Sequence, residues 1–181
     1  MKKVLKPAEF QCIKNLIGKK FKEIFFAAVS GILSNVDMLV FNFNTENLLS
    51  LHVFSFVRIV KNNRILLTSS DMYFNNEYEQ LKYEECQSDS IENTLLQKNI
   101  DSINQILANR TVIKAYITKL GDIRILFDNN VKIEVIVDAV YKNYECYRLL
   151  CSQKGCCYHH IVSYDDNGKA YYEKTVSDDD D

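Results

Sequence analysis

The residues best suited to chemistry are four cysteines and two histidines within fifteen positions of one another: Cys146, Cys151, Cys156, Cys157, His159 and His160. Thiolates and imidazoles are the ligands that zinc prefers, and four of them would complete a tetrahedral site. The spacing C-x4-C-x4-C-C-x-H-H lacks the C-x2-C pair that presents two thiolates to one ion. Neighbouring residues on a strand also point to opposite faces. Buried thiols without a metal are the favoured interpretation, so we expect no cofactor. The candidate zinc ligands are Cys151, Cys156, Cys157 and His159.

A nucleophilic cysteine from the same cluster would need an activating histidine nearby in space. The sequence shows no glycine-rich oxyanion loop, and no family signature surrounds any of the cysteines. P-loop, GxGxxG, HExxH and GxSxG motifs are absent as well. We therefore expect no catalytic residues and a protein that is not an enzyme. A zinc- or thiol-dependent enzyme built on the cluster is the less favoured alternative.

A concentrated acidic segment lies in the middle of the chain, where eight carboxylates between Ser69 and Asp101 face only Lys82 and Lys98. Paired carboxylates can perform acid–base catalysis. Acidic loops are more often solvated surfaces or docking patches, so the segment predicts a protein partner that is basic. The candidate partner-binding residues are Asp71, Glu77, Glu79, Glu84, Glu85, Asp89 and Glu92.

The positive charges indicate no nucleic-acid partner. Seven lysines face two glutamates between Met1 and Ile24, but the formal net charge of the chain is −2. Without a recognised nucleic-acid module, these lysines are best explained as a solvated surface. Arg58 and Arg148 occupy matched places in a repeated pattern. They could bind an anionic ligand, but pairing of each arginine with a nearby carboxylate at a strand end is favoured.

Length and composition indicate one soluble domain. The chain has 181 residues, of which 47% are hydrophobic and 25% are charged. No segment reaches the roughly 18 uncharged apolar residues of a membrane helix. Charged residues also interrupt any signal-peptide core near the N-terminus. We expect a cytoplasmic protein with no membrane partner, in which most of the six cysteines stay reduced.

One sequence pattern, which includes Arg58 or Arg148, occurs twice in the chain. Phe41 to Val53 is followed by Val57-Arg58-Ile59, and Phe127 to Val135 is followed by Tyr147-Arg148-Leu149. Each copy has an apolar run, an Asn-rich turn, an alternating run and an arginine between hydrophobic residues. Because asparagine tolerates the left-handed backbone of tight turns, each copy predicts a β-hairpin.

Other segments complete the predicted fold. Lys6 to Ile17 predicts a short helix, Phe21 to Val29 a strand, and Tyr158 to Ser163 a final hairpin with Ala170 to Thr175. Apolar residues from Ile91 to Leu107 recur at helical spacing, with a possible break at Asp101-Ser102.

The predicted class is α+β: an antiparallel β-meander of two similar hairpin halves, with an N-terminal helix and a helical insertion in the middle. We expect one domain over residues 1–177. Its halves are roughly residues 19–70 and 111–177, separated by an acidic and helical insertion at 71–110. A disordered acidic tail follows at residues 178–181.

Gly121 to Val135, followed by Tyr144-Glu145-Cys146-Tyr147-Arg148, resembles a pattern in small bacterial proteins of unknown function. Some of these are similar to immunity proteins of polymorphic-toxin and contact-dependent-inhibition systems. Tyr147 stands where that pattern has a tryptophan. The resemblance implies a binding protein that neutralises a toxin domain and carries no catalytic residues. A housekeeping or structural interaction protein is the alternative.

Overall fold

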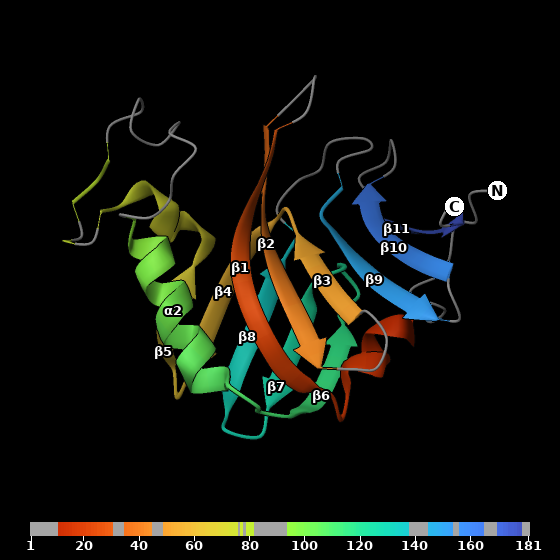
Figure 1. The fold of residues 1–181 in the computed structure, drawn as a ribbon, viewed down its shortest axis with the longest axis horizontal. Coiled ribbons are helices and arrows are strands. Elements are labelled where there is room, and N and C mark those ends of the chain that lie inside the picture. The colour runs from red at the N-terminus through yellow and green to blue at the C-terminus, as the bar shows by residue number, and fades with distance from the viewer. Residues whose placement is uncertain are drawn as a thin grey trace.

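Two antiparallel β-sheets packed face to face form the body of the molecule (Figure 1). The computed structural model describes residues 11–30, 35–44, 49–75, 77, 79–81, 94–137, 145–153, 156–164 and 170–178. From Ser152 onward it describes the backbone alone. The α+β class predicted from the sequence is confirmed.

The first sheet, sheet A, has the strand order β1-β2-β3-β9-β10-β11. Its strands are β1 (Lys20–Ser30), β2 (Asn35–Asn44), β3 (Leu49–Val53), β9 (Tyr147–Gln153), β10 (Cys156–Tyr164) and β11 (Ala170–Asp178). Sheet B has the order β5-β4-β8-β7-β6. Its strands are β4 (Phe56–Lys61), β5 (Arg64–Thr68), β6 (Val112–Ile117), β7 (Ile123–Phe127) and β8 (Val131–Ile136).

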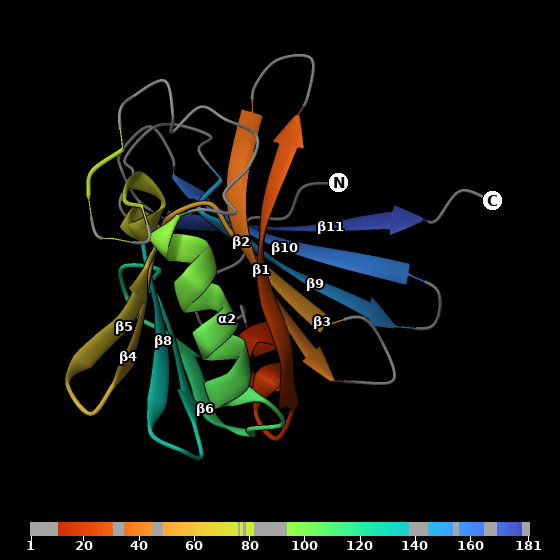
Figure 2. The same cartoon turned by 60° about the vertical axis from the view of Figure 1, so that its left-hand side comes forward.

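Three helical elements accompany the sheets in the described part of the chain. They are the 3-10 helices η1 (Gln11–Leu16) and η2 (Ser69–Tyr73) and the α-helix α2 (Leu95–Leu107). The Thr94 side chain caps the start of α2 by accepting a hydrogen bond from the Gln97 amide. Figure 2 shows α2 lying across the molecule beside β1 and β5, which it contacts.

The hydrophobic core lies between the two sheets. Residues alternate between buried and partly exposed positions along β7 and β8, as expected for strands with one face toward a core. The ring of Phe21 in β1 makes edge-to-face contacts with Phe43 of sheet A and Phe127 of sheet B, with centroid distances of 6.3 and 5.9 Å. This aromatic cluster therefore connects the sheets across the core.

The predicted β-meander of two hairpin halves is divided between two sheets, because the chain exchanges sheets twice. Both repeated hairpins exist, β2 with β3 in sheet A and β7 with β8 in sheet B. After β3 the chain crosses to form β4 beside β8, and after β8 it crosses back to form β9 beside β3. The crossings touch, since the amides of Phe54 and Ser55 both donate to the Cys146 carbonyl at 2.9 and 3.1 Å.

The molecule is built from two equivalent units. The first unit contains η1 and β1 to β5, and the second contains α2 and β6 to β11. Each has a helix, a three-stranded meander in one sheet, and further strands in the other sheet. Their reciprocal hydrogen bonds define matched positions: Phe21 N donates to Arg110 O (2.8 Å), and Val112 N donates to Lys19 O (2.9 Å).

Irregular features recur at matched places in the two units. The strand register shifts just after Phe21 in β1 and just after Val112 in β6. Gly18 and Asn109, which follow η1 and α2, both have positive φ values, 83° and 60°. Matched bulges and left-handed residues are specific local features, so the equivalence extends beyond the hairpins detected in the sequence.

The helical predictions have mixed outcomes. The predicted N-terminal α-helix is not seen. Within the described residues, its C-terminal part is the 3-10 helix η1, and residues 1–10 lie outside the description. The central helical insertion is confirmed by α2, which runs unbroken through Asp101 and Ser102. The final hairpin is confirmed by β10 and β11, and β11 ends at Asp178.

Candidate partner-binding surfaces

Hydrogen bonds with Asn75 hold two of the predicted acidic residues at the surface. The side-chain oxygen of Asn75 accepts hydrogen bonds from the amides of Glu77 and Glu79, each at 2.9 Å. The Asn75 amide donates to the Glu79 carbonyl at 2.9 Å, and Asn75 Nδ2 donates to Glu79 Oε2 at 3.1 Å. Glu77 and Glu79 are exposed. We call Asn75, Glu77 and Glu79 the acidic turn.

The acidic turn is connected to the helix behind it. Phe74 forms a β-bridge with Gln80, and Asn75 forms one with Thr94, the N-cap of α2. The Leu95 amide donates to the Phe74 carbonyl at 2.8 Å. Because α2 packs against β1 and β5, the turn is connected through α2 to both sheets.

Asp71 has a structural role in its surroundings. Its carboxylate accepts hydrogen bonds from the amide and hydroxyl of Thr68 at 3.0 and 2.8 Å, forming a capping box at the start of η2. It also accepts from Asn99 Nδ2 on α2 at 2.7 Å. Asp71 therefore joins η2 to α2, with both carboxylate oxygens engaged. The other acidic candidates, Glu84, Glu85, Asp89 and Glu92, lie outside the described residues.

The strand register separates the candidate zinc ligands. Cys151 is buried in β9 and pairs with Tyr158 of β10, whereas His159 pairs with Leu150. Because successive strand positions belong to opposite faces, Cys151 and Cys156 are on one face of sheet A, and Cys157 and His159 on the other. Among the described residues, no group of three or more histidine, cysteine or acidic side chains could hold a metal ion.

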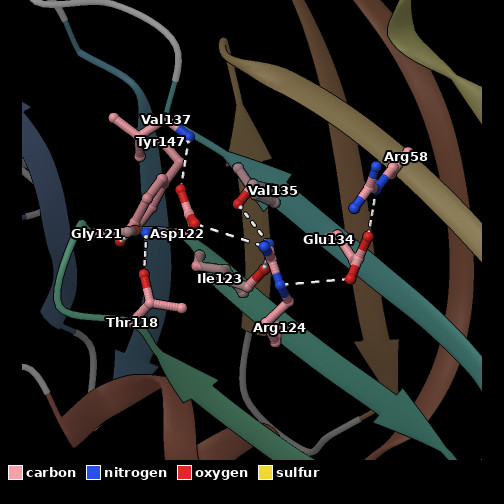
Figure 3. A network of polar contacts seen from close by, with 10 residues as sticks. All are labelled: Arg58, Thr118, Gly121, Asp122, Ile123, Arg124, Glu134, Val135, Val137 and Tyr147. Atoms are coloured by element: carbon pink, nitrogen blue, oxygen red, sulfur yellow. Dashed lines mark hydrogen bonds and ion pairs between the residues drawn. The ribbon is translucent and has the colours of Figure 1, made fainter.

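Arg58 belongs to a charged network on the outer face of sheet B (Figure 3). It pairs with Glu134 on the neighbouring strand β8, and Arg124 Nε lies 3.4 Å from the other oxygen of the same carboxylate. Arg124 also reaches Asp122 at 3.5 Å, and Asp122 accepts from the Val137 amide at 3.1 Å. The preferred interpretation, that Arg58 pairs with a nearby carboxylate, is confirmed.

Arg148 pairs with a carboxylate in a different way. Its neighbour on β3 is His52, and its guanidinium forms two hydrogen bonds with Glu145, at 2.5 and 2.6 Å. Hydrogen bonding to Glu145 raises the pKa of Arg148 against the opposing effect of burial. The guanidinium carbon also lies 5.4 Å from the centre of the Phe54 ring. The two matched arginines therefore both pair with carboxylates of the same chain.

Sequence reasoning missed two residues whose hydrogen bonds organise the acidic turn and the core. Asn75 organises the acidic turn, and the Tyr147 hydroxyl donates to the Gly121 carbonyl at 2.8 Å inside the core. The Thr68-x-x-Asp71 spacing is a recognisable capping-box signal, and an asparagine followed closely by polar residues is typical of a side-chain-stabilised turn. No local signal marks Tyr147 as a hydrogen-bond donor to Gly121, because the two residues meet only through the packing of the sheets.

Comparison of the chain with models of known protein families, with curated protein sequences and with solved structures finds no match. In the described part of the chain, no helix has both the length and the apolar character needed to cross a membrane.

Proposed function

We propose that this chain is a non-catalytic protein-binding module, specifically an immunity-type inhibitor that neutralises a toxin domain. The acidic turn carries the proposal, because Glu77 and Glu79 are exposed on a backbone held by Asn75. Residues already held by hydrogen bonds before binding lose less conformational entropy on association. Such a turn suits recognition of a partner with complementary charge.

The charge of the turn indicates the kind of toxin. Toxin domains that act on nucleic acids need basic clefts, because their substrates are polyanions. Exposed carboxylates attract such a cleft over long range and can occupy it in place of the substrate. The acidic candidates from Glu84 to Glu92 follow the turn closely in the sequence and carry the same charge.

Co-expression with a captured partner tests this function. The tagged protein would be cross-linked in its native cells, and the partner identified by mass spectrometry. That partner would then be expressed in a naive host, alone and with the inhibitor. We expect the partner alone to stop growth and the wild-type chain to restore it, with Glu77→Lys/Glu79→Lys restoring it less well.

Charge reversal elsewhere provides the control. Asp101→Lys/Asp128→Lys changes the net charge equally at two exposed carboxylates outside the turn and should restore growth like the wild type. A partner that has no effect on growth would overturn the immunity function. Equal loss of rescue in both double variants would overturn the role of the acidic turn.

A further inference from the structure

Four cations with exposed side chains lie close together along the backbone where the two units meet, at the beginnings of β1 and β6. Lys20 forms a β-bridge with Thr111, and reciprocal backbone hydrogen bonds hold Lys19 and Arg110 on either side of it. The side chains of Lys19, Lys20, Arg110 and Lys114 are all exposed. The sequence places two of these residues near position 20 and two near position 110, so only the fold brings them together.

Exposed isoleucines accompany these cations. The amide of Gly18 donates to the Val112 carbonyl at 2.8 Å, so the peptide after Ile17 is hydrogen-bonded to the peptide before Ile113. Ile17 is 45% exposed and Ile113 is 51% exposed. Two large aliphatic side chains therefore flank one backbone contact at the surface. We call Ile17, Lys19, Lys20, Arg110, Ile113 and Lys114 the basic corner.

Two carboxylates near the basic corner already have partners. Glu23 accepts a hydrogen bond from Asn42 Nδ2 at 3.0 Å and lies 3.5 Å from Lys22. Asp128 accepts a hydrogen bond from the Thr111 amide at 3.2 Å. The basic corner therefore presents four exposed cations, whereas the whole chain has a net charge of −2.

We propose that the basic corner is a docking surface for an acidic protein segment that also carries apolar side chains. The cations would attract carboxylates, and Ile17 and Ile113 would lose their solvent exposure on binding. A nucleic acid fits this surface less well. Its backbone offers the isoleucines no apolar partner, and aliphatic side chains provide no flat ring for stacking bases. This surface is separate from the acidic turn and has the opposite charge.

Fluorescence anisotropy with the full chain tests the proposal with three labelled probes of equal negative charge. They are a peptide of alternating Glu and Leu, a peptide of alternating Glu and Ser, and a thymidine oligonucleotide. We expect the Glu/Leu peptide to bind about fivefold more tightly than the Glu/Ser peptide, because only its leucines offer apolar contacts to Ile17 and Ile113. The oligonucleotide should bind most weakly.

Variants locate the binding surface. Lys20→Glu/Arg110→Glu should weaken binding of the Glu/Leu peptide about tenfold or more, because attraction becomes repulsion. Ile113→Ser should remove most of the preference for Glu/Leu over Glu/Ser. The control Lys61→Glu/Arg64→Glu changes the charge equally at the turn between β4 and β5, on the opposite edge of sheet B, and should bind like the wild type.

Several outcomes would overturn the proposal: equal affinity for the two peptides, tighter binding of the oligonucleotide, or equal weakening by both charge-reversal pairs. Circular dichroism melting curves would verify that each variant is folded. Glu77→Lys/Glu79→Lys should retain peptide binding. Failure at the basic corner is therefore distinguishable from failure of the proposed inhibitor function.

Discussion

The two units of the molecule share one strand plan but cover their matched edge strands differently. In the first unit, β1 is covered by α2, and the side chain of Asn104 bonds both the amide and the carbonyl of Ile24 at 2.8 and 2.9 Å. In the second unit, β6 is contacted by the 3-10 helix η1, where the residue matched to Asn104 is the buried Ile13. A side-chain amide can form hydrogen bonds with the backbone groups of an edge strand, and an isoleucine side chain cannot.

This difference shows how a repeated fold can produce unlike surfaces. Edge strands expose backbone donors and acceptors, and proteins usually cover such edges. Helix α2 of the second unit covers the edge of the first. Where η1 of the first unit meets β6, Ile17 and Ile113 are about half exposed. The basic corner therefore lies at one of two matched edges that are covered differently.

The largest expected effect is a difference in stability between variants of β4 and β9, the strands that follow the two crossings between the sheets. Tyr147 in β9 and Val57 in β4 precede the matched arginines, and both are fully buried. Tyr147→Ala should lower the free energy of unfolding by about 3–5 kcal/mol, and Val57→Ala by about 2 kcal/mol, because the larger side chain leaves the larger cavity. Urea denaturation measures both values. An equal or larger loss for Val57→Ala would contradict the comparison.

The next largest loss of stability tests how α2 covers the edge of β1. Asn104→Ala removes both hydrogen bonds to Ile24 and should cost about 1–3 kcal/mol, because a half-buried backbone donor and acceptor lose their partner. Hydrogen exchange at the Ile24 amide should become faster. The neighbouring residue Gln105 is exposed and provides the control, since Gln105→Ala should change stability by less than about 0.5 kcal/mol. Unchanged exchange at Ile24 would remove the role assigned to Asn104.

A smaller effect separates the two arginine pairs. Glu134 forms ion pairs with both Arg58 and Arg124. Glu145 pairs with Arg148, three positions further along the chain. Glu134→Gln should cost about 1 kcal/mol and Glu145→Gln about half of that, because these partly exposed pairs are screened by solvent. Thermal melts at low and high salt would compare them. The shared-carboxylate account fails if Glu145→Gln is the more destabilising change.

The smallest effect is a dependence on pH confined to the first unit. The hydrogen bond from Asn42, followed by attraction to Lys22, lowers the pKa of Glu23 below its ordinary value of 4.5. A lowered folded-state pKa stabilises the protein above the unfolded value, and this contribution disappears as pH falls through the folded value. Glu23→Gln should therefore slightly reduce the loss of stability below pH 4.5.

Asn42→Ala provides the matched test of that cause. It removes the largest contribution to the shift and should reduce the acid sensitivity in the same direction as Glu23→Gln. Unfolding free energies between pH 3 and 7 would measure both variants. If both variants lost unfolding free energy at low pH as steeply as the wild type, the Glu23 carboxylate would not contribute to acid sensitivity.

The sequence predicted local structure well and long-range arrangement poorly. Asn130, in the turn between β7 and β8, has a positive φ of 63°, which is the conformation that made the hairpin predictable. The sequence could not show that the chain crosses to sheet B at β4 and back to sheet A at β9. An alternating pattern shows which face of a strand is buried, but not to which sheet the strand belongs. Register between distant strands decides that pairing.

The candidate site was predictable to a similar degree. Composition identified the acidic segment, and it included Glu77 and Glu79, which are exposed. It also included Asp71, whose role depends on Asn99 of a helix 28 positions away in the chain. The basic corner required the bridge between Lys20 and Thr111, which no local pattern indicates.

The most direct test of the inhibitor account is the rate at which the purified chain associates with its captured partner. Stopped-flow fluorescence would compare the wild type with Glu77→Lys/Glu79→Lys at low and high salt. We predict an association rate at least tenfold lower for the variant at low salt, and a much smaller difference at high salt, because salt screens steering charges. Equal association rates at low salt would contradict the proposal that the acidic turn recognises a basic partner.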